Sequence, residues 1–128
     1  MGAGSARLGS EAELMPGVSI HVVDVSRGVV AQGMRVSLSG ATQRGLIASG
    51  VIAANGLLAE PALSARFEAG LYEAEFHVGE YYAAAGIKPA IPFLEVVTYR
   101  FGIADPQQHI HLPFKCTPWG YSCFRGGA

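Results

Sequence analysis

Two histidines, His109 and His111, stand two residues apart in the run 109–113. Alternate residues of a β-strand share a face, so both imidazoles would point the same way. Such a pair can bind a metal ion when another segment supplies a further ligand. No carboxylate or thiolate accompanies the pair at a recognised metal-binding spacing. We therefore expect no bound metal, and a zinc site is the alternative interpretation.

A third histidine, His21, interrupts an otherwise apolar stretch, residues 18–25. Taken alone, a histidine in a strand is more often a structural residue than a catalytic one. The other distinctive segment is the run 117–128, TPWGYSCFRGGA, which keeps several glycines and Trp119. Glycine loses much conformational freedom on folding and tryptophan carries a large apolar ring, so both are costly in a segment without a role.

Cys116 and Cys123 are the two cysteines of the chain. They could form one disulfide bond, but nothing else in the sequence suggests a secreted, disulfide-stabilised scaffold. We therefore predict two reduced thiols in a cytoplasmic protein. For Cys123 we expect a small, buried side chain.

The elements that must position these residues are predicted to be strands. Apolar residues alternate with polar ones in the runs 18–25, 34–38 and 71–78, and the run 93–103 is rich in aromatic and β-branched residues. Turn signals separate them, of which Asn55-Gly56 is the strongest. Only Glu80–Ala85 favours a helix, which Gly86 would end. The pattern predicts an all-β sandwich of two sheets, with seven or eight strands and one short helix.

Length and composition limit the possible functions. The chain has 128 residues, which is enough for one domain. We assign this domain to residues 17–128 and expect residues 1–16 to be a flexible tail. Met15, within the tail, could be the true start of the protein. Half of the residues are hydrophobic and 15% are charged, which favours an oligomer. The net charge of −1 without a basic run argues against nucleic acid binding. No stretch is long and apolar enough for a membrane span or a signal peptide.

Four segments carry a resemblance to a known family. In order along the chain they read SIHVVDVSRG (19–28), FHVGEYYAA (76–84), PFLEVVTYRFGIADPQQHIHLP (92–113) and TPWGYSCFR (117–125). In their order and spacing they resemble the signature segments of the 5-hydroxyisourate hydrolases. The resemblance covers essentially residues 17–126 and implies the transthyretin fold, with two four-stranded sheets and one helix. It also implies a dimer of dimers whose active sites lie in a central channel.

The resemblance further implies hydrolysis of a small molecule without metal or cofactor. In that family two histidines, an arginine and a C-terminal Tyr-Arg-Gly-Ser ending line the site. The two histidines match His21 and His111. Because histidine titrates near neutral pH, one imidazole can deprotonate water while the other positions it or protonates the leaving nitrogen. The arginine would hold the anionic, carbonyl-rich substrate or its oxyanion.

The chain departs from that pattern at three positions. Leu57 follows Asn55-Gly56 where the resemblance places the arginine, and Phe124 and Gly127 replace the terminal tyrosine and serine. Losing one oxyanion donor typically costs about 10²–10³ in turnover. Arg44 or Arg66 could substitute for the arginine, although neither is at the motif position. We expect the substrate to contact Leu57, His109, Phe124, Arg125 and Gly126.

Three functions follow from these residues. The first is a divergent enzyme that uses the histidine pair on a cyclic or more apolar small molecule, by hydrolysis, isomerisation or ring closure. It is favoured because Leu57 and Phe124 both exchange polar groups for apolar ones. The second is a genuine 5-hydroxyisourate hydrolase. The third is a non-catalytic, transthyretin-like binder, which the retained histidines argue against.

Overall fold

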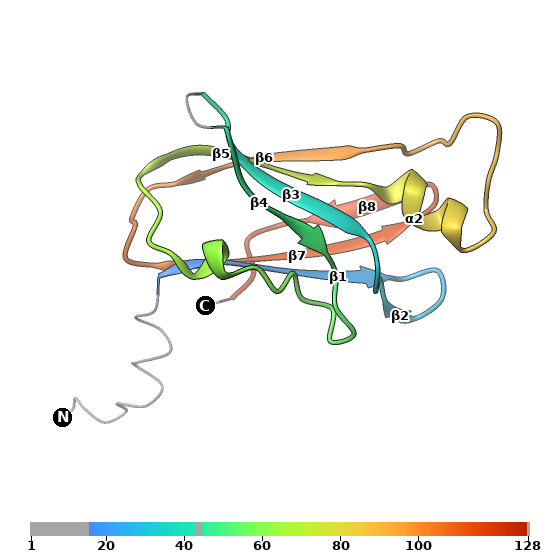
Figure 1. Ribbon diagram of the computed structural model, residues 1–128, viewed down its shortest axis with the longest axis horizontal. Coiled ribbons are helices and arrows are strands. Elements are labelled where there is room, and N and C mark those ends of the chain that lie inside the picture. The colour runs from blue at the N-terminus through green and yellow to red at the C-terminus, as the bar shows by residue number, and fades with distance from the viewer. Residues whose placement is uncertain (1–15, 43–44, 128) are drawn as a thin grey trace.

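The chain folds into two stacked four-stranded sheets with one short helix at one end (Figure 1). The computed structural model describes residues 16–42 and 45–127. The strands are β1 (Gly17–Asp24), β2 (Val29–Val30), β3 (Arg35–Gly40), β4 (Leu46–Val51), β5 (Gly70–Phe76), β6 (Val97–Ile103), β7 (His109–Thr117) and β8 (Gly120–Cys123), and the helices are the 3₁₀ turn η1 (Pro61–Ser64) and α2 (Val78–Ala84). The all-β, transthyretin-like sandwich predicted from the sequence is confirmed.

The first sheet has the strand order β2-β1-β7-β8 and the second β4-β3-β5-β6. Among the described residues, all strand pairings but one are antiparallel. Strand β1 lies parallel to β7, with Gly17 opposite His109 and each later pair following in step to Asp24 opposite Cys116. This pairing joins segments about ninety residues apart, and it sets which side chains of the two strands are neighbours.

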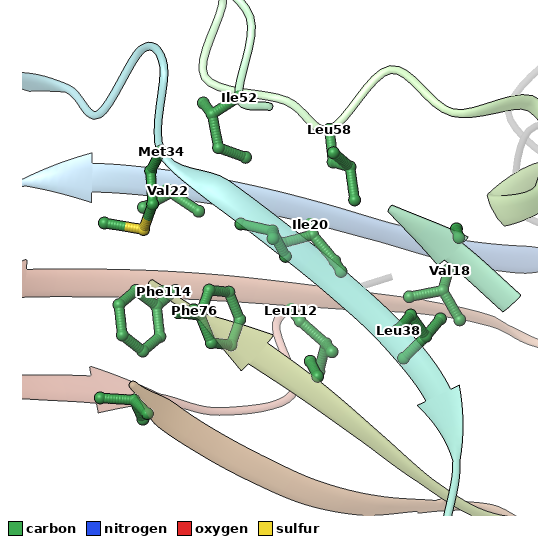
Figure 2. Packing of buried hydrophobic residues seen from close by; sticks show 14 of the residues in the cluster. Val18, Ile20, Val22, Met34, Leu38, Ile52, Leu58, Phe76, Leu112 and Phe114 are labelled. Carbon is green, nitrogen blue, oxygen red and sulfur yellow. The ribbon is translucent and has the colours of Figure 1, made fainter. Parts of the chain in front are cut away.

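The core lies between the sheets, where the alternating apolar residues of both meet (Figure 2). Phe76 of β5 and Phe114 of β7 stack across it with ring centroids 3.9 Å apart. The faces predicted for residues 18–25, 34–38 and 71–76 are the observed ones, with the apolar residues buried and the intervening ones at least partly exposed. One face of β1 and β7 therefore belongs to the core, and the other carries the histidines outward.

Three predicted elements differ from the observed ones at their ends. The helix spans Val78–Ala84 rather than Glu80–Ala85, and β5 stops at Phe76 although the apolar alternation runs on to Val78. Val78 is buried at the start of the helix, and the alternation also predicts a buried residue there in a strand, so its hydrophobicity does not distinguish the two. In the run 93–103, pairing begins only at Val97.

The carboxylate of Asp24 ties the helix to the end of β1. Its side chain is fully buried and accepts hydrogen bonds from Arg27 and from the hydroxyls of Ser26, Tyr81 and Tyr82, the last two on α2. Burial raises the pKa of Asp24, but these hydrogen bonds outweigh it and lower the pKa to about 2.

The remaining sequence predictions concern the cysteines, membrane-spanning segments and the N-terminal tail. Cys116 is buried, Cys123 is partly buried against the core, and both are unpaired thiols. No helix in the described ranges is long and apolar enough to cross a membrane. The tail predicted for residues 1–16 lies, apart from Pro16, outside the described residues, as does Arg44.

Candidate functional site

The parallel pairing of β1 with β7 brings His21, from the first strand, to the same sheet face as His109 and His111. Ser19 is opposite His111 and His21 is opposite Pro113 in this register. Because the intervening residues point into the core, these side chains point outward on the same face. His21 therefore joins the pair His109 and His111 in one group.

Ser19 lies between two of these imidazoles. Its hydroxyl oxygen is 2.8 Å from Nε2 of His109 and 2.6 Å from Nδ1 of His111, so it is hydrogen-bonded to both. The sequence analysis did not assign Ser19 to the site, because a serine in a half-buried strand is unremarkable. The signal that could have found it is its place on the same face as His21, two residues before it.

The surroundings of His111 favour its neutral form. Burial lowers the pKa of His111, and the nearby imidazoles of His109 and His21 lower it further because a second positive charge would be repelled. At neutral pH this imidazole therefore has a free nitrogen lone pair, which is the form that accepts a proton.

A turn segment of residues 55–58 covers the open edge of β1 beside His21. Leu57 pairs with His21 in an antiparallel bridge, between the hydrogen bonds of Val22 to Gly56 and of Leu58 to Ile20. Directly opposed residues of such a pair present their side chains on the same face. The structure thus places Leu57 next to His21.

The same turn also holds the His21 ring. Nε2 of His21 lies 3.2 Å from the carbonyl oxygen of Asn55, which can only accept, so Nε2 carries the proton of this hydrogen bond. Gly56 has a φ of +86° and faces the ring so closely that an added Cβ would overlap Nε2. Glycine is needed here both for its backbone conformation and for the close approach.

The C-terminal segment after β8 returns along β7 to His111. The backbone N–H of Gly126 donates to the carbonyl oxygen of His111 at 2.7 Å. A Cβ on Gly126 would lie 2.8 Å from the His111 ring, so this glycine also packs directly on an imidazole. Arg125 donates a hydrogen bond to Gln108 at 3.0 Å. Phe124 is 45% exposed, and the Lys115 ammonium lies 5.8 Å from its ring centroid.

An open hollow of about 550 Å³ is lined by His109 and Ser19 of the histidine group. Leu57, Leu58, Pro61 and Leu63 form much of its wall, and Ser19, Asn55, Glu60 and His109 provide the polar groups. None of its described lining residues is a cation. Arg66 lines a different hollow, with Ala62 and Phe67. The described residues include no group of three or more His, Cys, Asp or Glu arranged to hold a metal ion.

Comparison with known proteins identifies the family. The family model described as HIUase/Transthyretin matches residues 18–126, which is most of the chain and includes every side chain of the histidine group. The chain belongs to the HIUase/transthyretin family.

Members of this family with assigned names include close relatives over the full domain. A 5-hydroxyisourate hydrolase of Deinococcus radiodurans is 38% identical over 114 residues, which are 87% of this chain and 96% of that protein. The structure of Klebsiella pneumoniae 5-hydroxyisourate hydrolase superposes with a TM-score of 0.74 at 33% identity, over 88% of this chain and all of that one.

A second enzyme in the comparison is longer than this chain. The crystal structure of (S)-allantoin synthase superposes with a TM-score of 0.80 at 34% identity and covers 95% of this chain. The chain spans about half, 48%, of that protein. The family of this chain therefore includes enzymes, namely hydrolases and a synthase.

Proposed function

We propose that the chain is a cofactor-independent enzyme that hydrolyses a small cyclic molecule, with His21 and His111 as its acid–base pair. The observation that carries the proposal is the convergence of three imidazoles on one sheet face, beside a hollow without a cation in its described lining. We further propose that the substrate is less polar than 5-hydroxyisourate where it meets Leu57.

The chemistry follows from the protonation states of the two imidazoles. Neutral His111 takes a proton from water, and the water oxygen attacks the carbonyl carbon of a ring amide. The ring C–N bond then breaks, and the leaving nitrogen takes a proton. Nε2 of His21 carries such a proton, hydrogen-bonded to the Asn55 carbonyl at 3.2 Å, and gives it to the leaving nitrogen. The proton that His111 removed from water passes back to His21 through water in the same step, so both imidazoles end neutral. No net proton is gained or lost.

The neighbours of the histidines support a substrate with an apolar edge. Leu57 cannot donate a hydrogen bond, so a buried polar group of the substrate left against it would lose about 1–3 kcal/mol. Covering its side chain fully with an apolar group would contribute up to about 1.5–3 kcal/mol. Phe124 adds a second apolar surface on the returning C-terminal segment, and we propose that His109, Arg125 and Gly126 complete the substrate contacts.

Hydrolysis of 5-hydroxyisourate itself is the second candidate. It is favoured by the name of the Deinococcus radiodurans relative, which is 38% identical along almost its whole length. In this case Arg44, or another cation from a neighbouring subunit, would have to supply the charge that Leu57 does not.

We also propose that the working form is a homotetramer. Large apolar side chains are exposed on the protomer, including Phe93, Trp119, Tyr121 and Phe124. Strands β6 and β8 each end a sheet, and edge strands readily pair with another chain. In such an assembly the open hollow beside the histidines would be narrowed by a second dimer.

The test compares the wild-type protein with Leu57→Arg in the decay of freshly generated 5-hydroxyisourate, followed by ultraviolet absorbance against its spontaneous breakdown. We expect weak wild-type turnover, a rise of at least about 10-fold in Leu57→Arg, and a further rise with Phe124→Tyr. Leu71→Arg, which adds the same charge to an exposed position of the other sheet, should have no effect. Wild-type turnover of about 10⁴ M⁻¹s⁻¹ or more would instead establish the second candidate.

The histidine assignment has its own test. His21→Ala and His111→Ala should each abolish turnover of whichever cyclic amide the wild type hydrolyses, and the double variant should lose no more than either single one, because the pair acts as a unit. Near-wild-type turnover in both single variants would place catalysis elsewhere or make the protein a binder.

A further inference from the structure

We propose that Ser19 is a positioning residue that couples the protonation of His111 to that of His109, so that the two imidazoles share one proton through its hydroxyl. The inference rests on the proposed acid–base function of His111 and deepens it. Its basis is the geometry of two hydrogen bonds, of 2.6 and 2.8 Å, that meet on one oxygen.

The number of protons limits what the hydroxyl can do. A serine hydroxyl has one hydrogen, so it donates to one imidazole and accepts from the other. When Ser19 donates to Nδ1 of His111, Nε2 of His109 must be an N–H donor, and Nε2 of neutral His111 carries its hydrogen. When Ser19 donates to His109, Nδ1 of His111 carries the hydrogen, and Nε2 of His111 is a free base. The hydroxyl therefore decides which nitrogen of His111 is basic.

This coupling supplies a place for the proton taken from water. After Nε2 of His111 accepts that proton, the hydrogen on Nδ1 passes to the Ser19 oxygen, and the serine hydrogen passes to Nε2 of His109. His111 is neutral again and the positive charge is on His109. The reverse transfers return the proton to Nε2 of His111, from which it replaces the proton that His21 gives to the leaving nitrogen, so the serine ends unchanged and no proton is lost.

The charged and titratable groups around His111 are compatible with this role. Strand β1 contributes His21 and the serine itself, and β7 contributes His109. The C-terminal segment brings Arg125, whose guanidinium donates a hydrogen bond to Gln108, and Glu60, just after the turn segment, lines the same hollow as His109. Burial, and then repulsion from the other imidazoles, lowers the pKa of His111, which favours moving a proton away from it.

The experiment is nitrogen-15 NMR of the histidine rings in the full-length protein between pH 5 and pH 9, for the wild type, Ser19→Ala and Ser19→Thr. In the wild type we expect the titrations of His109 and His111 to be coupled, each curve showing two steps. Ser19→Ala should give two independent single-step curves and move the Nδ1 shift of His111. Ser19→Thr keeps the hydroxyl and should restore the wild-type pattern. Ser37→Ala, on the outer strand face of β3, is the matched control.

Activity gives the second readout. On a substrate that the wild type hydrolyses, Ser19→Ala should lower kcat by about 10-fold or more and shift the acid limb of the pH profile, while Ser19→Thr and Ser37→Ala stay near the wild type. Unchanged histidine titrations in Ser19→Ala would overturn the inference, and so would changed titrations with an unchanged pH profile. Coupled titrations in a wild-type protein that hydrolyses no cyclic amide would support the coupling and overturn the proposed function instead.

Discussion

Replacing Asp24 by asparagine should weaken the buried hydrogen bonds that join β1 to the helix α2. The carboxylate has no exposed surface and accepts hydrogen bonds as short as 2.6 Å from Ser26 and Tyr82 and 2.8 Å from Arg27. An asparagine keeps one acceptor oxygen, so its NH₂ group must face at least one of these donors. The variant loses both the charge and part of the hydrogen bonding, and the helix α2 loses its attachment to β1.

The magnitude follows from the pKa of Asp24. A carboxyl whose pKa falls from an ordinary 3.8 to about 2 on folding stabilises the folded state by about 2–3 kcal/mol at neutral pH, at about 1.4 kcal/mol per pH unit. Because the folded pKa is the lower one, this contribution is present above about pH 4 and is lost as the pH falls to about 2. Asp24→Asn should be destabilised by at least this amount at pH 7, and its loss of stability from pH 4 to pH 2 should be smaller than that of the wild type.

The assay is urea denaturation followed by circular dichroism at several pH values and one fixed protein concentration, since oligomers unfold in a concentration-dependent way. Glu80→Gln is the matched control. Its carboxylate pairs with Arg35 at 2.9 Å, but both side chains are at least half exposed, so the change should cost no more than about 1 kcal/mol. Equal costs for the two variants, or an equal loss of stability in acid for Asp24→Asn and the wild type, would refute the reasoning.

Four further results are expected. Gly56→Ala should cost about 1–2 kcal/mol of stability because φ is positive there, and it should lower turnover at least about 10-fold because the new Cβ displaces His21. Gly28→Ala is the control, since Gly28 has a φ of +69° but no atom near its Cβ position, so this variant should lose stability alone. Equal activity in the two variants would contradict the packing argument. Burial raises the pKa of Cys116 to about 11 and of Cys123 to about 12, so both thiols should react slowly with Ellman's reagent at pH 8 until urea is added, and fast reaction of the folded protein would count against their burial. Turnover should survive chelator treatment, whereas parallel loss of zinc and activity would support a metal site at His109 and His111. Light scattering should give four times 13.4 kDa, and a monomer at micromolar concentration would rule out a shared channel.

The sequence alone predicted which side chains of each strand face the core, because the alternation of side chains along a strand is a local property of the backbone. Each apolar residue of the run 18–25 is buried or exposed according to its parity, whichever strand becomes its neighbour. The family resemblance then predicted His21 and His111 as a pair. Ser19 could not be found in this way, because its hydrogen bonds depend on the register between β1 and β7. The start of the helix at Val78 could not be predicted either, because a buried apolar residue fits both a strand and a helix at that position.

The pairing of β1 with β7 has a consequence for how the protein acquires its histidine group during folding. The contact between Ser19 and His111 closes a loop of 92 residues, and the entropy lost in closing a loop rises with its length. Domains dominated by such distant contacts fold slowly, in milliseconds to seconds. The hairpin of β3 with β4 can form from nearby residues, whereas the group of imidazoles exists only once both ends of the domain have met. A partly folded chain can therefore contain native strands and still have no assembled site, and recovery of activity after dilution from denaturant should lag behind recovery of β-structure.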